Sequence, residues 1–318
     1  MAHRTTGKGF RLGIDLGGTK IEGVVLDRAS RPVAGHRIPT PRLPDPEAAY
    51  RATLEAVADL VRHLEAKAGA TASIGIGMPG SLAPKTGRVQ NANSTWLNDQ
   101  PFGQDLEHHL GRQVRLANDA NCFALSEATD GAGAGARSVL GVILGTGCGS
   151  GLVIDGRILD GPRGIGGEWG HNPLPWSHPD EHPGATCWCG RKGCMETWVS
   201  GPALAADYRR HTGVALTGED IAVQARTGEA EAIAALERHA SRLARGLAHV
   251  VNIVDPEVIV LGGGLSGLSH LYRDLPGLMA PYVFAEALDI IVRPPRWGDA
   301  SGVRGAAWLW PLDGPDGA

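Results

Sequence analysis

The stretch that decides the fold is residues 139–158, VLGVILGTGCGSGLVIDGRI. An apolar run leads into a Gly/Thr turn at 145–147 and a second apolar run returns from it, which is the pattern of two strands joined by a glycine turn. The same pattern occurs near the start of the chain, in residues 11–27, with its turn at 17–19. Two such units about 130 residues apart predict two similar α/β domains, each presenting a glycine turn to a shared cleft.

The segments around these units predict further elements. Apolar residues recur at helical spacing in 48–68 and in the long stretch 230–252, and a short apolar helix is expected at 302–310. Residues 73–80, SIGIGMPG, predict a strand that ends in a Pro-Gly turn. In 114–128, VRLANDANCFALSEA, a strand gives way to a helix at the Asn-Asp pair, where a carboxylate's ordinary role is to cap the helix.

Glycine turns suggest phosphate sites, but the common nucleotide motifs do not fit. Residues 262–267 match G-x-G-x-x-G after an apolar strand, yet we expect no βαβ unit there because only about fifty residues remain. No G-x-x-x-x-G-K-[ST] motif occurs in the sequence, which excludes a P-loop. At 17–19 the exposed backbone N–H groups suit a phosphate, and Asp15 suits Mg²⁺ held through water. Taken alone, this segment fits a hairpin without a ligand at least as well.

A Cys-rich segment near the middle of the chain predicts a metal site. Three of the five cysteines, Cys187, Cys189 and Cys194, follow a C-x-C-x4-C pattern, and His171 lies upstream. One imidazole and three thiolates form a closed tetrahedral set for structural Zn²⁺. The alternatives are a disulfide or three unrelated thiols. A disulfide would leave one of the three cysteines over, and C-x-C is too short to bridge easily.

Two carboxylates flank this segment. Glu168 precedes the histidine by three residues, and Glu196 follows the last cysteine by two. A metal would fix both carboxylates in space, and preformed acceptors of this kind suit the recognition of several hydroxyl groups. Both glutamates would equally serve as ordinary solvated surface charges.

Composition excludes several classes of protein. The 318 residues, 42% of them hydrophobic and 46 of them glycine, fit two domains with many turns. A net charge of −4 and no basic run argue against a nucleic-acid partner. We find neither a signal peptide nor a stretch long enough to span a membrane. Clustered cysteines then suit a reducing compartment, so we expect a cytoplasmic protein.

The ordered motifs DLGGTK, GMPG, ANDANCFALSEA, LGTGCGSG, GEWGH, C-x-C-G-x-x-G-C-x-E, VIVLGGG and GVRGAAWLW cover nearly the whole chain. In this order they resemble the repressor–ORF–kinase (ROK) family of sugar kinases. The resemblance implies the actin-like (hexokinase/Hsp70) α/β fold, with two similar domains around a cleft and a structural zinc site. It implies a smaller domain at 1–118, joined by the C-terminal helix at about 302–312, and a larger domain at 119–301 that carries the zinc motif.

The resemblance also implies roles for individual residues. Asp119 matches the catalytic base that takes the proton from the sugar's primary hydroxyl. The sugar-binding positions implied are Gly80, Asn93, Asn118, Asp119, Glu168, His171 and Glu196. The ATP and Mg²⁺ positions implied are Asp15, Gly17, Gly18, Thr19, Lys20, Gly145, Thr146, Gly147, Gly262, Gly263 and Gly264. The Zn²⁺ ligands implied are His171, Cys187, Cys189 and Cys194, and a homodimer is expected.

The sugar is a narrower inference. Residues 87–102, 167–176 and 298–311 look like the bacterial fructokinase (mannokinase-like) branch, so we expect ATP-dependent phosphorylation of the 6-hydroxyl of fructose. Glucokinase, mannokinase and N-acetylglucosamine kinase are the alternatives. A ROK repressor would need a DNA-binding domain ahead of the first strand, where only about ten residues stand. A non-catalytic sugar-binding protein would not need the catalytic aspartate and both phosphate turns.

Overall fold

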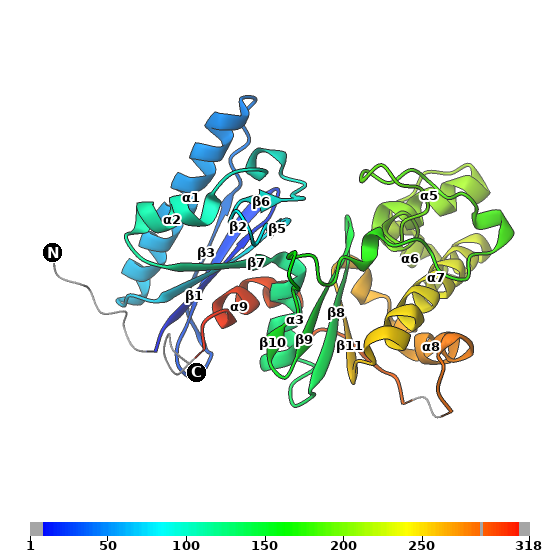
Figure 1. The fold of residues 1–318 in the computed structure, drawn as a ribbon. Helices are drawn as coiled ribbons and strands as arrows, with labels where there is room; N and C mark the ends of the chain where they lie inside the picture. The colour runs from blue at the N-terminus through cyan, green and yellow to red at the C-terminus, as the bar shows by residue number, and fades with distance from the viewer. Residues whose placement is uncertain (1–8, 287–288, 312–318) are drawn as a thin grey trace.

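The chain folds into two five-stranded sheets, each built around one glycine-turn hairpin (Figure 1). The computed structural model describes residues 9–286 and 289–311. Across the first sheet the strands are β3 (Pro32–Pro39), β2 (Lys20–Leu26), β1 (Arg11–Leu16), β4 (Ser73–Met78) and β7 (Val114–Asn118). Across the second they are β10 (Arg157–Ile158), β9 (Cys148–Ile154), β8 (Ser138–Leu144), β11 (Val258–Gly262) and β12 (Ile291–Arg293). The expected repeat of one unit is confirmed.

Both sheets follow one pairing scheme. The hairpin strands β1 and β2 are antiparallel, as are β8 and β9, and each sheet continues antiparallel beyond its hairpin. On the other side, β4 and β7 run parallel to β1, and β11 and β12 run parallel to β8. A small sheet of β5 (Ser81–Leu82) and β6 (Val89–Gln90) follows β4. Because parallel strands end at the same edge of a sheet, the turns and strand ends that carry the motifs gather at one edge of each unit.

The helices α1 (Pro46–Ala68) and α2 (Phe102–Leu110) cover one face of the first sheet. The sequence sets both ends of α1: the Asp45 side chain accepts from the Ala48 N–H at the start, and Gly69 adopts a left-handed conformation at the end. Its apolar stripe is buried in the core that this sheet shares with both helices.

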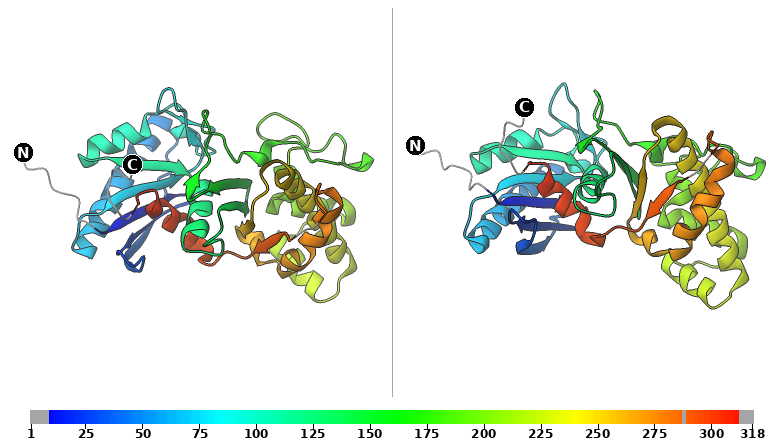
Figure 2. Two further views of the ribbon diagram at one scale, coloured as in Figure 1. Left: turned by 60° about the horizontal axis from the view of Figure 1, so that its bottom comes forward. Right: turned by 90° about the horizontal axis from the view of Figure 1, so that it is seen from below.

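Two helices lie between the sheets. α9 (Ser301–Trp308) covers the other face of the first sheet, and α3 (Asp119–Thr129) covers the facing side of the second. Figure 2 shows, from two further directions, that α9 lies between the strands of the first sheet and α3. The two helices cross in direct backbone contact, because a Cβ on Gly305 would stand 1.7 Å from the Cys122 carbonyl oxygen. A larger residue at 305 would therefore push the two units apart.

The outer face of the second sheet carries a helical layer. It consists of α5 (Gly201–Thr212), α6 (Gly218–Arg226), α7 (Ala230–Val254) and α8 (Ser269–Met279), and the short α4 (Glu196–Val199) leads into it. These helices form one core with the outward-facing side chains of β8 and β11. None of the described helices is both long enough and apolar enough to cross a membrane.

One expectation about the third glycine turn is wrong. The structure does contain a βαβ unit after it, because β12 pairs in parallel with β11 and α8 connects the two strands. The unit fits into the short remainder of the chain because α8 has 11 residues and β12 only 3. No second nucleotide-binding half follows, since the chain continues into α9 on the other sheet.

The domain boundary remains our proposal. We place it between residues 118 and 119, with 302–312 added to the first domain, of which residue 312 lies outside the described part. In its support, the strands of the first sheet lie within 11–118 and those of the second within 138–293.

Candidate active site

A cavity of about 950 Å³ opens between the two units. All seven residues expected to bind the sugar line it: Gly80, Asn93, Asn118, Asp119, Glu168, His171 and Glu196. The second glycine turn, residues 145–147, lines the same cavity. Segments far apart in the sequence thus bring the expected sugar positions and one expected phosphate turn to one place.

The other expected nucleotide positions lie outside this lining. They are Asp15, Gly17, Gly18, Thr19 and Lys20 at the first turn and Gly262, Gly263 and Gly264 after β11. Gly263 packs on the end of β8, where a Cβ would stand 2.5 Å from the Leu144 carbonyl oxygen. The third turn therefore lies directly beside the second. This proximity would allow a single nucleotide to contact both turns.

Asp119 opens α3 and faces the cavity, while its neighbour caps the helix. The Asn118 Oδ1 accepts from the N–H groups of Ala120 (2.9 Å) and Asn121 (3.3 Å), and its Nδ2 donates to the Gly80 carbonyl at 3.0 Å. Asp119 Oδ1 also accepts from Ala120 N–H at 2.9 Å. Among the described residues no partner is found for Asp119 Oδ2. The ordinary capping role thus belongs to Asn118, and one oxygen of Asp119 stays available to a ligand.

Burial, and to a smaller extent neighbouring negative charge, raises the pKa of the carboxylates in and near the site. The Asp119 side chain is open to the cavity but surrounded by protein atoms at its base, and this desolvation raises its pKa, with the negative charge of Glu168 adding to the effect. Desolvation also raises the pKa of Glu168. Desolvation, together with the charge of Asp119, raises the pKa of Asp15 to about 6. A carboxylate with a raised pKa is the better proton acceptor near neutral pH.

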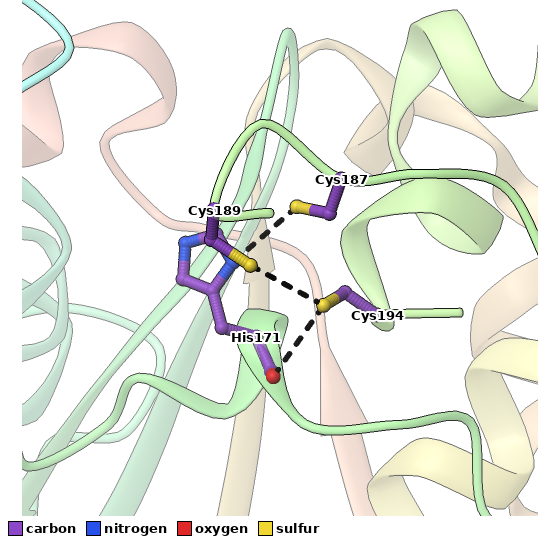
Figure 3. Close-up of side chains that lie close together, drawn as sticks. All are labelled: His171, Cys187, Cys189 and Cys194. Atoms are coloured by element: carbon purple, nitrogen blue, oxygen red, sulfur yellow. Dashed lines mark hydrogen bonds between the residues drawn. The ribbon is translucent and has the colours of Figure 1, made fainter. Parts of the chain in front are cut away.

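The predicted metal ligands converge (Figure 3). One ligand atom from each of His171, Cys187, Cys189 and Cys194 lies within 4.8 Å of every other, and all the cysteines are free. The Cys187 Sγ is 3.6 Å from the His171 Nδ1, and the Cys189 Sγ is 3.6 Å from the Cys194 Sγ.

These separations match the edges of a zinc tetrahedron. Zn–S bonds of about 2.3 Å and Zn–N bonds of about 2.0–2.1 Å put N and S about 3.6 Å apart, and two sulfurs about 3.8 Å apart. A disulfide would need about 2.05 Å between sulfurs. The four residues therefore fit Zn²⁺. The imidazole uses Nδ1 toward the sulfurs, which leaves its other nitrogen pointing away from them (Figure 3).

Glu196 connects the metal cluster with the second glycine turn. Its Oε2 accepts from the Cys148 N–H at 3.0 Å, and its Oε1 accepts from the Trp188 indole at 2.8 Å. A Cβ on Gly147 would stand 2.7 Å from the same Oε2. The glycine at 147 thus leaves room for the glutamate.

A buried ion cluster holds the Cys-rich loop on the helical layer. Glu181, within this loop, accepts from Arg242 at 2.9 Å and from both terminal nitrogens of Arg245 at 2.7 and 2.8 Å. All three side chains are buried, and both arginines extend from α7. If the loop moved, these ion pairs would break and leave buried charges unpaired. The ion cluster therefore holds the loop firmly in place.

Sequence reasoning missed several residues that line the cavity. They include Trp188, Ile165 and Arg191. The tryptophan stands between two predicted metal ligands, which was the one available signal, because a metal site fixes whatever lies within it.

Comparison with known proteins identifies the family. Residues 11–312 match the ROK family. An N-acetyl-D-glucosamine kinase from Yersinia enterocolitica is 39% identical over 301 residues, which cover 93% of this chain and 98% of the relative. The ROK hexokinase from Thermus thermophilus has a TM-score of 0.81 and 33% identity, with 94% and 97% of the two chains covered. A ROK family glucokinase from Streptomyces griseus, solved with glucose and AMPPNP, has a TM-score of 0.76 and 27% identity, with 95% and 99% covered. The chain therefore belongs to the ROK family, with its actin-like α/β fold, and is an ATP-dependent sugar kinase.

Proposed function

We propose that this kinase transfers the γ-phosphoryl group of ATP to the 6-hydroxyl of a hexose, with Asp119 as the general base. The observation that carries the proposal is the Asp119 carboxylate in the cavity lining, with one oxygen unpartnered and a raised pKa. Positioned proton transfer of this kind contributes roughly 10²- to 10⁴-fold to the rate.

The surrounding residues would position the two substrates. Asn93, Asn118, Glu168 and Glu196 offer amide and carboxylate groups for the sugar hydroxyls, with the imidazole of His171 beside them. The glycine turns offer backbone N–H groups to the phosphates. Phosphoryl transfer passes through a loose, highly charged transition state, so positioning and charge neutralisation supply most of the catalysis.

The residues present also fit the two expected metals. The Asp15 carboxylate has no hydrogen-bond partner among the described residues, and desolvation together with the charge of Asp119 raises its pKa to about 6, so a cation bound there would offset unfavourable negative charge. Mg²⁺ held there through water would neutralise charge on the ATP phosphates. Zn²⁺ at the histidine–cysteine cluster would cross-link the loop that carries His171 and Glu196.

N-acetyl-D-glucosamine is the sugar that the relatives favour. A kinase for this sugar shares 39% identity with nearly the full chain, and an expectation of fructose gains no comparable support from the proteins compared. We therefore propose N-acetyl-D-glucosamine as the first substrate. Fructose stays the second candidate, because residues 87–102, which include the cavity residues Asn91 and Asn93, resemble the fructokinase branch.

ADP release with Mg-ATP and N-acetylglucosamine, fructose, mannose or glucose tests this order. The hexose with the highest kcat/KM is the substrate. A highest value for N-acetylglucosamine supports our first choice, and a highest value for fructose supports the second. If none of the four sugars releases ADP from folded, zinc-loaded protein, the hexose kinase proposal is wrong.

Asp119→Asn tests the base. The amide keeps the size and the hydrogen bond to Ala120 but cannot accept the sugar's proton, so we expect kcat to fall at least about 100-fold. Calorimetry should show sugar affinity within about threefold of wild type. Asp59→Asn is the matched control, since Asp59 is exposed on α1 and is not part of the cavity lining. A kcat within threefold of wild type for Asp119→Asn would refute the assignment.

A further inference from the structure

Trp188 is an exposed tryptophan in the wall of the active-site cavity. Its side chain is 63% exposed, although an indole is among the largest apolar groups. Ile165, also exposed at 44%, lines the same cavity. Apolar side chains that line a cavity beside a few polar groups are typical of a small-molecule site. A hexose presents C–H groups as well as hydroxyls, so such a mixed wall suits it.

The indole is held in one orientation from two sides. Its Nε1 donates to Glu196 Oε1 at 2.8 Å. Its ring meets the His171 imidazole edge-on, with ring centroids 5.0 Å apart and planes at 85°. Trp188 lies between two residues of the metal cluster, so Zn²⁺ bound there would hold its backbone in place as well.

The same hydrogen bond also fixes the carboxylate that it reaches. With Oε2 held by the Cys148 N–H and Oε1 by the indole, Glu196 can rotate only by breaking one of these bonds. A carboxylate oxygen accepts more than one hydrogen bond, so both oxygens keep capacity for a sugar hydroxyl. The glutamate is thus oriented before the sugar arrives.

From this arrangement we propose that Trp188 is a positioning and specificity residue of the sugar site: its N–H orients Glu196, and its ring covers an apolar edge of the bound hexose. The inference rests on the proposed sugar-binding role of the cavity. Preorientation lowers the cost of ordering on binding, so its loss raises KM for the sugar rather than lowering kcat.

Trp188→Phe removes the N–H and keeps an aromatic ring against the imidazole. Hydrogen bonds to charged groups are stronger than neutral ones, so we expect KM for the sugar to rise roughly 10-fold. KM for ATP and kcat should stay within about twofold. Trp188→Leu, which also loses the ring, should raise the sugar KM further, and zinc content should stay at one per chain in both variants.

Trp176→Phe is the matched control. Trp176 is also exposed, at 47%, and lies in the same loop, but it packs on Tyr282 and does not line the cavity. Addition of the sugar without ATP should change tryptophan emission in wild type and in Trp176→Phe, and not in Trp188→Phe. This readout is independent of phosphoryl transfer.

Two results would overturn the inference. One is that Trp188→Phe keeps a sugar KM within twofold of wild type and still shows the wild-type change in tryptophan emission when sugar is added. The other is a proportional rise in KM for ATP, which would indicate a general structural role. If wild type gives the emission change but none of the four hexoses yields ADP, the proposed hexose phosphorylation fails while the inference about Trp188 stands.

Discussion

The two glycine-turn hairpins have one topology but different supports. In the first, the Gly17 carbonyl accepts from the Thr40 hydroxyl at 2.6 Å, and the Gly18 carbonyl accepts from Arg42 Nε and Nη2 at 3.1 and 2.8 Å. In the second, the Gly145 carbonyl accepts from the Gly201 N–H at 2.8 Å, at the start of α5. One turn is held by the segment that follows β3, and the other by the segment that follows the metal cluster.

This difference matters because a trans peptide places a carbonyl and the next N–H on opposite sides. Holding the carbonyls of 17 and 18 therefore fixes the direction of the N–H groups of 18 and 19, the groups expected to meet a phosphate. The second turn additionally packs on Glu196. We infer that the first turn is held independently of the sugar site, whereas the second turn is coupled to the sugar site through Glu196.

Loss of the metal should give the largest functional difference between the two hairpins, because only the second turn contacts a residue of the metal-bound segment. Removing Zn²⁺ with a chelator, or replacing Cys194 by Ser, should free Glu196 and the second turn and lower kcat/KM for the sugar roughly 100-fold. Elemental analysis and steady-state kinetics measure both quantities. Absence of zinc from protein purified without chelator would contradict the site.

A methyl group added to each turn gives a direct comparison. Gly147→Ala places its Cβ 2.7 Å from Glu196 Oε2, so we expect the sugar KM to rise at least about 10-fold as the glutamate shifts. In Gly18→Ala the nearest atom is the Ser94 Oγ at 3.9 Å, and the sugar KM should stay within twofold. Equal effects from both variants in sugar-binding kinetics would remove the distinction between the turns.

Arg42→Ala should affect only the nucleotide. Losing two charge-assisted hydrogen bonds to the Gly18 carbonyl frees the first turn, and we expect KM for ATP to rise about 5- to 10-fold with the sugar KM unchanged. Arg42→Lys, which keeps one donor, should lie between. A change in sugar KM of the same size would show that this turn is coupled to the sugar site too.

The last expected effect concerns stability and pH rather than kinetics. Asp15 lies two residues before the first turn, where the second hairpin has Ile143. Its pKa is raised above the ordinary value, so the folded state binds the proton more tightly and the free energy of unfolding falls as pH rises from about 4 to 6. Asp15→Asn should therefore match wild type below pH 4 and be more stable above pH 6, by up to about 3 kcal/mol for a shift of about two pKa units.

Thermal unfolding without nucleotide at pH 4 and pH 8 measures this difference, and Ile143→Leu is the control in the other hairpin. Asp15→Asn should also weaken Mg-ATP binding. If wild type and Asp15→Asn had the same free energy of unfolding at pH 8, the Asp15 carboxylate would not destabilise the folded state.

Much of the fold was predictable because its signals are local. Strand–turn–strand patterns, the helical spacing of 48–68 and the Asn-Asp pair at a strand end all depend on neighbouring residues, as does the cysteine spacing. The βαβ unit was missed because residue count is a poor guide to how short a crossover can be. Glu181 and Trp188 were missed because their partners Arg242 and Glu196 are set by tertiary packing, which leaves no period in the sequence.

The placement of α9 has a consequence for synthesis of the chain. Strands β1, β4 and β7 are complete at residue 118, but the helix that covers one face of their sheet ends at Trp308, roughly 190 residues later. At about 5–20 residues per second, a ribosome needs about 10–40 s to make that remainder. Throughout this interval the sheet face that α9 covers stays open. It presents Gly13 and Gly75, which lie against the α9 backbone in the complete fold, and Arg11, which stacks on Trp308, so the waiting face exposes little apolar side-chain surface.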